Sequence, residues 1–278
     1  MGIDDSVTHT VVVTGAAGRI GCELRTLLAG PNRVLRLLDT APQDPLADGE
    51  HAEIVTGSYT DADLMERVLD GADGIVHLGG CAGERPWADI LATNIDGTQR
   101  LLESAQSAGV RRVVIASSHH VAGNYQRADA DAVEDGRHVL SAGIRPRPDT
   151  YYGVSKAAME ALGSLYADQF GMHVVAIRIG TTARPPLWGR QNLIWISYRD
   201  LAAMTEAALG DLGAPASPGF AVWWGVSRNS GSWLAHEPAR SAGFVALDDA
   251  STVPSGPLSD EPARLGGTWT QLALGERL

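Results

Sequence analysis

Cysteine is scarce in this chain. Only Cys22 and Cys81 occur among the 278 residues, and no paired spacing links them. Two isolated cysteines argue against a disulfide framework and suit a reducing compartment, so we expect a cytoplasmic protein. Cys81 follows two glycines and is a candidate pocket residue, but it lacks a clear activating partner and is not expected to be a catalytic thiol.

Basic charge is also scarce. The sequence has 22 Lys and Arg residues against 33 Asp and Glu residues, which gives a net charge of −11. Because nucleic acids are bound through clustered Lys and Arg, we expect no nucleic-acid partner. Adjacent residues on a strand point to opposite faces, so His119 and His120 are not expected to chelate a metal together, and we predict no metal site.

Long apolar runs are absent from the sequence, and no stretch approaches the about 20 residues that a membrane-spanning helix requires. Residues 1–9 have neither a basic start nor an apolar core, so we interpret them as a loose lead-in and not as a signal peptide. We therefore expect no membrane partner. With 44% hydrophobic residues, the chain can bury one large core.

What the sequence does contain is a glycine-rich turn near its start. A β-branched run at residues 10–13 leads into glycines at positions 15, 18 and 21, and an apolar helical pattern follows. Such a turn lets the backbone approach a pyrophosphate at the positive end of the helix. A glycine triplet alone is a weak signal, but its place between a strand and a helix favours dinucleotide binding.

Asp39 directly follows residues 34–38, which are predicted to form the next strand. This is roughly the spacing after a glycine turn at which an acid binds the adenosine ribose hydroxyls. An anionic carboxylate there would repel a 2′-phosphate, so we expect the cofactor to be NAD. The alternative is that Asp39 caps a helix or a turn.

Strands and helices alternate along the first two thirds of the chain, with a long helix beginning at Pro86 and further strands at residues 52–56, 74–78, 112–116 and 173–179. The alternation predicts an α/β protein with a doubly wound parallel sheet, the Rossmann fold, which binds ligands at the carboxyl ends of its strands. We expect one unit over residues 1–278, with an NAD-binding core at 8–180 and a mainly substrate-facing lobe and tail at 181–278.

Two connections are expected to lack regular structure. Residues 124–150 are polar without clear periodicity, and long connections of this kind in compact domains are usually functional or disordered. The tail from about Ser251 is rich in Pro and Gly and is interpreted as an arm.

The candidate catalytic residues are Tyr152, Lys156 and Ser118. Residues four apart on a helix project from the same face, so Tyr152 and Lys156 can reach one substrate. A phenol titrates at about pH 10 and is a poor base at neutrality unless a cation such as Lys156 favours the phenolate. Ser118 would hold the substrate oxygen whose proton Tyr152 removes. The alternative is a solvated Tyr and Lys on an ordinary helix.

These features together resemble an extended short-chain dehydrogenase/reductase of the NAD-dependent epimerase/dehydratase superfamily. The resemblance covers most of the chain. Within that family, the stretches HLGG, NIDGTQ, ASSHH, YYGVSK, IRIG and WISYRD are most similar to uronate dehydrogenases and next to archaeal NAD-dependent glucose-6-phosphate dehydrogenases. Both relatives oxidise an anomeric hydroxyl to a lactone.

The resemblance implies a role for each matching residue. Tyr152 would be the base, Lys156 would bind the nicotinamide ribose and lower the pKa of Tyr152, and Ser118 would hold the reacting oxygen. The residues implied to bind NAD are Gly15, Ala17, Gly18, Arg19, Ile20, Gly21, Asp39, Ser58, Tyr59, Leu78, Gly79, Gly80, Asn94, Ser117, Tyr152, Lys156 and Ile179. Those implied to contact a sugar acid are Ala82, Ser118, His119, His120, Thr181 and Arg190.

Some positions need separate comment. Asn94 sits within an apolar helical stretch, so we also expect it to hydrogen-bond the backbone at a strand end. The uronate pattern has serine at Ala82, asparagine at His119 and serine at Thr181, of which only Thr181 keeps the hydroxyl. A polar pocket left unpaired loses discrimination, so these three departures predict a substrate other than a common uronate. The family often has an aspartate at Ser58, and its loss weakens one contact with the cofactor.

Other functions stay open. A sugar-phosphate dehydrogenase would use Arg190, with Arg184 or Arg85, to meet phosphate, and a neutral aldose dehydrogenase is a further alternative. An epimerase or dehydratase is less favoured because the carboxyl-terminal lobe shows no nucleotide-binding signature, and a non-catalytic NAD-binding protein would share the same fold. The family usually dimerises through helices like those expected at residues 86–108 and 151–170, which implies a homo-oligomer.

Overall fold

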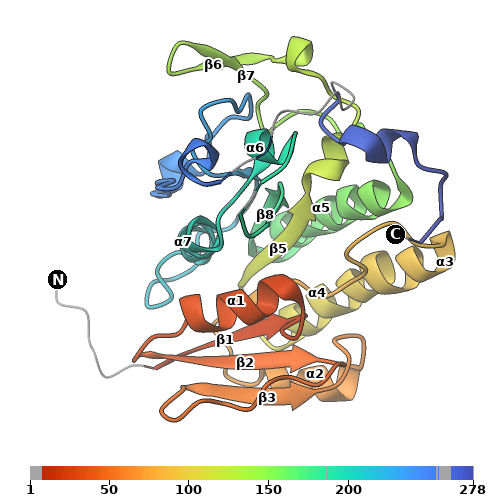
Figure 1. Cartoon of the computed structure of the whole chain (residues 1–278). Helices are drawn as coiled ribbons and strands as arrows, with labels where there is room; N and C mark the ends of the chain where they lie inside the picture. Colours follow the sequence, from red (N-terminus) through yellow and green to blue (C-terminus); the bar gives the residue numbers. More distant parts are fainter. Residues whose placement is uncertain (1–7, 186, 255, 257–263, 278) are drawn as a thin grey trace.

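A seven-stranded sheet runs through the molecule, and all of its strands are parallel (Figure 1). The structure is a computed structural model and describes residues 8–185, 187–254, 256 and 264–277, which leaves most of the expected lead-in outside. In spatial order the strands are β3 (Ala52–Thr56), β2 (Arg33–Asp39), β1 (His9–Thr14), β4 (Gly74–His77), β5 (Arg112–Ser118), β8 (His173–Ile179) and β9 (Gly219–Gly225). This order confirms the predicted doubly wound sheet.

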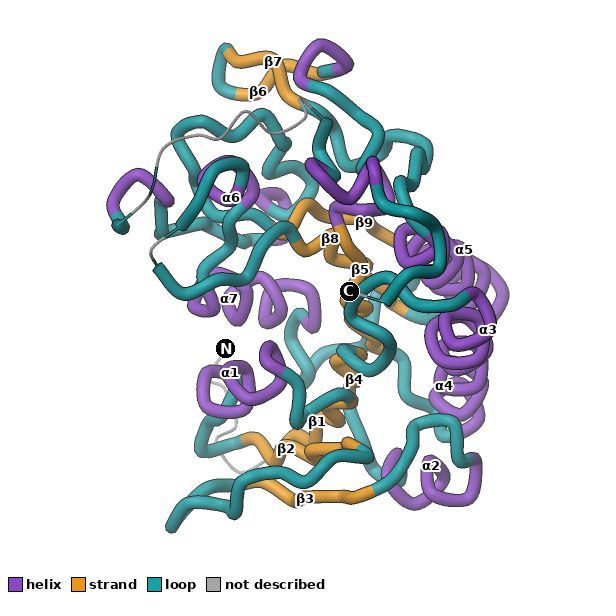
Figure 2. The backbone as a smooth tube through the Cα atoms, turned by 45° about the vertical axis from the view of Figure 1, so that its right-hand side comes forward, coloured by secondary structure: helices purple, strands orange, loops and turns teal. Residues whose placement is uncertain are grey.

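Helices cover both faces of the sheet (Figure 2). Successive strand residues point to opposite faces, so Val11 and Val13 pack in one apolar core and Val12 packs in the other. The first core includes α1 (Arg19–Leu27) and α7 (Tyr198–Leu209). The second includes α2 (Ala62–Leu69), α4 (Gly97–Ser107) and α5 (Tyr151–Phe170).

The helix that we expected to run unbroken from Pro86 is divided into three parts. These are α3 (Trp87–Ile90), the π-helical stretch η1 (Leu91–Asp96) and α4. A π turn is wider than an α turn, and such bulges occur frequently at functional sites. Here the wide stretch contains Asn94, which is fully buried.

Residues 124–150 are not the structureless loop that we expected. They contain a 3-10 turn, η3 (Arg127–Asp129), and an antiparallel hairpin of β6 (Ala132–Glu134) and β7 (Arg137–Val139), which lies at the top of Figure 1. Asp135 and Gly136 join the two strands with φ angles of 50° and 75°. Two successive positive φ angles are what a type I′ hairpin turn requires, and Asp-Gly is among its preferred pairs.

The carboxyl-terminal part does not separate from the sheet at residue 180. β9 pairs with β8 as the last strand, and α7 packs beside α1. The described part of the expected arm is folded into short turns, η5 (Ala250–Thr252) and η6 (Gly267–Gln271), and the other short elements are α6 (Gln191–Ile194) and η4 (Arg240–Ala242). The sheet therefore extends past the expected boundary, and the functional division of the chain stays a prediction.

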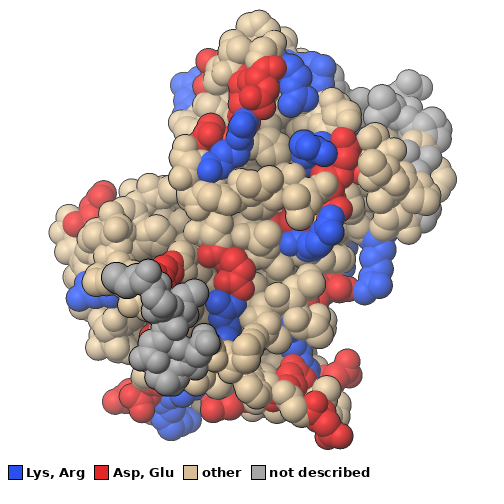
Figure 3. Space-filling view, turned by 90° about the vertical axis from the view of Figure 1, so that its left-hand side faces the viewer, with Lys and Arg blue, Asp and Glu red and all other residues tan. Residues whose placement is uncertain are grey.

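Acidic and basic side chains lie interspersed on the face shown in Figure 3. Several of the molecule's ion pairs join separate elements; Arg33 on β2, for example, pairs with Glu206 on α7. Within the described ranges, no helix is both long and apolar enough to cross a membrane.

Candidate active site

A cavity of about 900 Å³ opens beside the carboxyl ends of β1 and β4, where the strand order reverses. Open α/β sheets bind ligands at this position. Two predicted residues, Ala17 and Asn94, are not part of its wall. The wall includes the other predicted residues, namely Gly15, Gly18, Arg19, Ile20, Gly21, Asp39, Ser58, Tyr59, Leu78, Gly79, Gly80, Ala82, Ser117, Ser118, His119, His120, Tyr152, Lys156, Ile179, Thr181 and Arg190.

The glycine turn is held by backbone contacts that leave no room for side chains. Gly15 has a φ of 71°, and a Cβ there would lie 2.7 Å from the amide nitrogen of Gly79. A Cβ on Gly21 would lie 2.5 Å from the carbonyl oxygen of Gly15. Gly18 precedes α1, and no side chain caps the first turn of that helix. The positive end of α1 is therefore available to an anion at the cavity wall.

Asp39 closes the turn from the end of β2. Its carboxylate accepts hydrogen bonds from the backbone amides of Ala17 and Ala41, each at 2.9 Å. The alternative role as a turn cap is thus realised, and it explains why Ala17 faces Asp39 and not the cavity. A carboxylate has about four lone-pair sites, so these two bonds leave capacity for ribose hydroxyls.

The side chains of two predicted cofactor residues are engaged in hydrogen bonds within the protein. The Asn94 side chain accepts from the amide of Cys81 at 2.7 Å and donates to the hydroxyl of Ser155 at 2.8 Å. The expected backbone bond thus falls on the loop after β4 and not on the strand end itself. This side chain is fully buried outside the cavity wall, and its contact with the cofactor stays a prediction. Ser117 lines the cavity, but its hydroxyl donates to Glu160 at 2.6 Å.

The predicted catalytic trio is brought together at one side of the cavity. Tyr152 and Lys156 come from the first turns of α5, and Ser118 ends β5 and is a hydrogen-bond partner of Tyr152. A Cβ on Gly153 would lie 2.5 Å from the carbonyl oxygen of His120, so α5 starts directly against the backbone that follows β5. The glycine after Tyr152 therefore sets how closely the helix approaches the strand.

The electrostatics of the trio differ from our expectation. Burial raises the pKa of Tyr152 to about 12, although the hydrogen bond with Ser118 acts in the opposite direction. The Nζ atom of Lys156 lies 5.6 Å from the Tyr152 ring centroid and donates to the carbonyl oxygen of Ala116 at 2.7 Å. Burial lowers the pKa of Lys156 to about 8. The predicted lowering of the Tyr152 pKa is wrong for the protein alone, where burial is the larger effect.

His119 and His120 do not point to opposite faces. The strand ends at Ser118, and a 3-10 turn, η2 (His119–Ala122), begins with the two histidines, whose ring centroids lie 4.1 Å apart. Our reason for excluding joint chelation was therefore wrong. No group of three His, Cys, Asp or Glu side chains suited to a metal comes together in the part of the chain that the structure describes.

His119 holds Arg190 at the cavity wall. A carbonyl oxygen can only accept, so the 3.2 Å contact between His119 Nδ1 and Ile179 O puts the ring proton on Nδ1. Nε2 then accepts from Arg190 Nη1 at 3.3 Å. Nη1 also donates to the carbonyl oxygen of Leu265. Burial holds the pKa of His119 well below its usual value, so the ring is neutral near pH 7.

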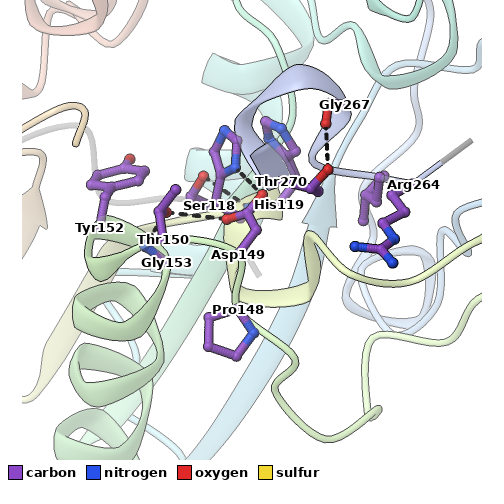
Figure 4. A network of polar contacts seen from close by, with 12 residues as sticks. Ser118, His119, Pro148, Asp149, Thr150, Tyr152, Gly153, Arg264, Gly267 and Thr270 are labelled. Atoms are coloured by element: carbon purple, nitrogen blue, oxygen red, sulfur yellow. Dashed lines mark hydrogen bonds and ion pairs between the residues drawn. The ribbon is translucent and has the colours of Figure 1, made fainter. Parts of the chain in front are cut away.

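His120 has the rings of Trp269 and His119 as neighbours, and it is hydrogen-bonded to the buried Asp149. Trp269 stacks on it at a centroid distance of 4.1 Å, and His120 Nδ1 lies 2.8 Å from Oδ2 of Asp149. Figure 4 shows Asp149 beside Ser118, His119 and the start of α5. Asp149 and Trp269 were not predicted from the sequence. Neither sits in a periodic segment, and the only available signal for Trp269 was a lone aromatic residue in a Gly- and Thr-rich tail.

The model of the NAD dependent epimerase/dehydratase family matches residues 11–186. The chain belongs to this family. Uronate dehydrogenase of Pseudomonas putida is 35% identical over 261 residues, which are 92% of each chain. NAD-dependent glucose-6-phosphate dehydrogenase of Haloferax volcanii is 32% identical over 87% of this chain and 94% of its own length.

Solved structures agree with this family assignment. The crystal structure of uronate dehydrogenase from Agrobacterium tumefaciens matches with a TM-score of 0.82 and 34% identity, over 96% of this chain and 98% of that chain. A mutant of the same enzyme complexed with NAD matches with a TM-score of 0.82 and 33% identity, over the same shares.

The cavity fits the dinucleotide after which the family is named. Gly15 and Gly18 keep side chains out of the turn, the positive end of α1 can face a pyrophosphate, and Asp39 stands at the end of β2. Lys156 lies in the same wall, beside Tyr152. These residues would carry the charge and hydrogen bonds that the dinucleotide needs.

Proposed function

We propose that this protein is an NAD-dependent uronate dehydrogenase, which oxidises the anomeric hydroxyl of a cyclic sugar acid to the aldarolactone. The proposal rests above all on one observation: Tyr152, Ser118 and Lys156 share a cavity with Arg190 and with the glycine turn. A proton acceptor, a hydroxyl that can hold the reacting oxygen and an anion-binding cation are thus present in one site. The uronate dehydrogenases among the relatives support the choice of substrate class.

Each of the three catalytic candidates has a distinct task in this proposal. The Ser118 hydroxyl holds the reacting oxygen, and Tyr152 takes its proton as general base. When bound, NAD⁺ would supply the hydride acceptor, and its positive charge would favour the phenolate. Lys156 adds its own charge near the Tyr152 ring. These charges are needed because the pKa of Tyr152 is raised to about 12 in the protein alone, mainly by burial.

Arg190 is the proposed clamp for the uronate carboxylate. A guanidinium donates two parallel hydrogen bonds to a carboxylate and has no acceptor of its own. His119 and Leu265 both accept from Nη1, so the group is held in a fixed place at the wall. That fixed place is expected to orient the sugar ring with its anomeric carbon toward Tyr152.

A sugar-phosphate dehydrogenase is the second candidate, because the Haloferax volcanii relative is named for glucose 6-phosphate. The two further arginines that we considered for phosphate do not support it. Arg184 is paired with Glu23, its side chain is 79% exposed, and neither Arg184 nor Arg85 is part of the cavity wall. The other arginine of the wall, Arg19, is the first residue of α1 at the glycine turn, so Arg190 alone is proposed to meet the anion of the substrate. A single guanidinium suits a carboxylate better than a dianionic phosphate.

The remaining proposals concern the setting of the enzyme. We infer a cytoplasmic protein from its two unpaired cysteines. We also infer a homo-oligomer, on the family resemblance of α4 and α5, and a chain in which residues 8–180 mainly bind NAD while residues 181–278 mainly face the substrate. Analytical ultracentrifugation tests the oligomer, and a single monomer peak would reject it.

The deciding experiment is NADH formation, followed by absorbance, with galacturonate, glucuronate, glucose 6-phosphate and neutral aldoses, each with NAD⁺ and NADP⁺. We expect turnover of a uronate with NAD⁺. Tyr152→Phe should lower kcat by about 10²–10⁴-fold, whereas its neighbour Tyr151→Phe serves as the matched control with near-normal turnover. Turnover of phosphate esters alone would favour the second candidate, and NADH binding without any turnover would favour a non-catalytic protein.

A further inference from the structure

Asp149 is a buried carboxylate for which the reaction proposed above has no task. Its side chain has no exposed surface and lies one residue before Thr150, the cap of α5 (Figure 4). The Thr150 hydroxyl donates to Oδ1 of Asp149 at 3.1 Å, and His120 Nδ1 lies 2.8 Å from Oδ2. A charged group is rarely kept in such a place unless it is paired and hydrogen-bonded.

The carboxylate sits in a cradle of backbone from two distant segments. A Cβ on Gly123 would lie 2.0 Å from Oδ2 of Asp149, and a Cβ on Gly266 would lie 1.9 Å from the same atom. These two glycines are themselves joined, because the amide of Gly266 donates to the carbonyl oxygen of Gly123 at 2.8 Å. The segment before Asp149 is also fixed, since Asn124 donates to the carbonyl oxygen of Pro148 at 2.8 Å. Asp149 therefore has one available position.

The contact with Asp149 decides which nitrogen of His120 carries the proton. Burial raises the pKa of Asp149 to about 6 and lowers that of His120 to about 3, so near pH 7 the acid is ionised and the ring is neutral. An ionised carboxylate only accepts, so the ring proton is on Nδ1 and Nε2 carries a lone pair. The rotation of the ring is restricted by Trp269, which stacks on it, and by the tilted ring of His119, whose centroid lies 4.1 Å away.

The two histidines of the wall thus have the same tautomer and different uses. The Nε2 atom of His119 is occupied by Arg190. His120 also lines the cavity, and its acceptor nitrogen complements a ligand group that donates. A hydroxyl can donate to it, whereas a carboxylate, a phosphate dianion or a ketone would present a second lone pair.

We propose that Asp149 is a positioning residue that fixes His120 as a hydrogen-bond acceptor for a ring hydroxyl of the sugar acid. The inference rests on the proposed function for the identity of the ligand. Arg190 only donates hydrogen bonds and would bind the carboxylate of the ligand. His120 then only accepts and would bind a ring hydroxyl. This pair gives the bound ring one orientation.

The test uses Asp149→Asn in the full-length protein and measures the tautomer directly. Because the Thr150 hydroxyl donates to Oδ1, the oxygen of the Asn amide is expected to keep that bond, so that its NH₂ group faces Nδ1 of His120 and donates to it. We therefore expect the His120 proton to move to Nε2 in the ¹⁵N spectrum of histidine-labelled protein. The His120 signals are identified as those missing from His120→Gln. The matched control is Asp168→Asn, which removes the same charge from an exposed position on α5. An unchanged His120 tautomer in Asp149→Asn would overturn the proposal.

Kinetics give the second readout, with a parent uronate and its monodeoxy analogues. In the wild type, one analogue should lose about 10–100-fold in kcat/KM, since a buried acceptor is left unpaired. Asp149→Asn should lose a similar factor on the parent and little more on that analogue. On the His120→Gln background, Asp149→Asn should have no further effect on this selectivity, because it acts through His120.

The outcomes separate this proposal from the function on which it rests. If the wild type oxidises no uronate, the proposed function fails, while the tautomer measurement still decides the role of Asp149. NADH binding and thermal unfolding check that each variant is folded. If Asp149→Asn does not fold, two other single variants replace it: Thr150→Val, which removes the hydroxyl that donates to Asp149, and His120→Gln. Undiminished selectivity in His120→Gln would reject His120 as a hydrogen-bond acceptor for the sugar.

Discussion

Glu84→Gln is expected to loosen the catalytic helix and the carboxyl-terminal wall together. Glu84 is fully buried, and its Oε1 accepts from the backbone amides of Tyr151 at 3.2 Å and Gly275 at 2.8 Å. Its Oε2 accepts from the amide of Tyr152 at 2.8 Å. One carboxylate thus binds the start of α5 at the proposed base and also holds the chain end that carries Trp269.

The size of the effect follows from these three bonds. In glutamine one oxygen is replaced by an NH₂ group, which then faces at least one backbone N–H in a dry site. Losing a hydrogen bond to a charged group costs about 1.5–3 kcal/mol. A negative charge near a helix amino terminus contributes about 0.5–2 kcal/mol more when it is buried. We expect Glu84→Gln to lower the free energy of unfolding by about 2–5 kcal/mol, within the range that a folded domain tolerates.

Urea unfolding measures this difference, and hydrogen exchange of residues 264–277 shows whether the chain end is released. Glu66→Gln, at an exposed position on α2, is the matched control and should change stability by less than about 0.5 kcal/mol. The variant should also turn over more slowly, because Tyr152 and Trp269 lose a shared anchor. A change in Glu84→Gln no larger than that of the control, with unaltered exchange at Gly275, would refute the proposed anchor.

Burial lowers the pKa of Lys156 to about 8, so we expect kcat/KM to fall as the pH rises through that value and the ammonium loses its charge. Lys156 is the only lysine of the sequence, so the single side-chain NMR signal of lysine-labelled protein measures this pKa directly. The pKa of Asp149 is raised from 3.8 to about 6, so its stabilising contribution is present below about pH 4 and lost as the pH rises through about 6. Urea unfolding across that window should show this dependence in the wild type and not in Asp149→Asn. His119→Leu should raise the KM for a uronate by about 10-fold, and His119→Gln, which keeps an acceptor, should raise it less; equal KM values would count against His119 as the support of Arg190.

The fold was predictable where hydrophobic residues recur with the period of a strand or helix, and where the residues of a turn allow one backbone conformation. Val11, Val12 and Val13 are all buried and pack alternately in the two cores, as expected for a strand covered on both faces. The glycine turn and the pair Tyr152 and Lys156 were predictable as one site, because carboxyl ends of parallel strands meet at the same edge. The hairpin was missed but could also have been predicted, since Asp135-Gly136 is a preferred pair for a type I′ turn.

The missing parts of the site depend on contacts between segments far apart in the sequence. Leu265 and Gly266 donate backbone hydrogen bonds to the carbonyl oxygens of Tyr125 and Gly123, more than a hundred positions earlier. Backbone bonds of this kind leave no pattern in side chains, so the place of Trp269 had no local signal. The histidine pair was misjudged for a related reason: the strand ends one residue before His119, and element ends are poorly marked in a sequence.

Two departures from the uronate pattern act on the same wall. Ala82 has no side-chain hydrogen-bonding group, and His119 directs Nδ1 to Ile179 and Nε2 to Arg190, so neither side chain has a hydrogen bond to offer to a sugar hydroxyl. A site rejects the wrong sugar mainly when a buried polar group is left unpaired. Without hydrogen bonds from these two positions, the site still selects a carboxylate through Arg190. It has fewer hydrogen bonds with which to distinguish uronates that differ at one carbon. We therefore expect the pattern's departures to broaden the substrate range more than to move it away from sugar acids.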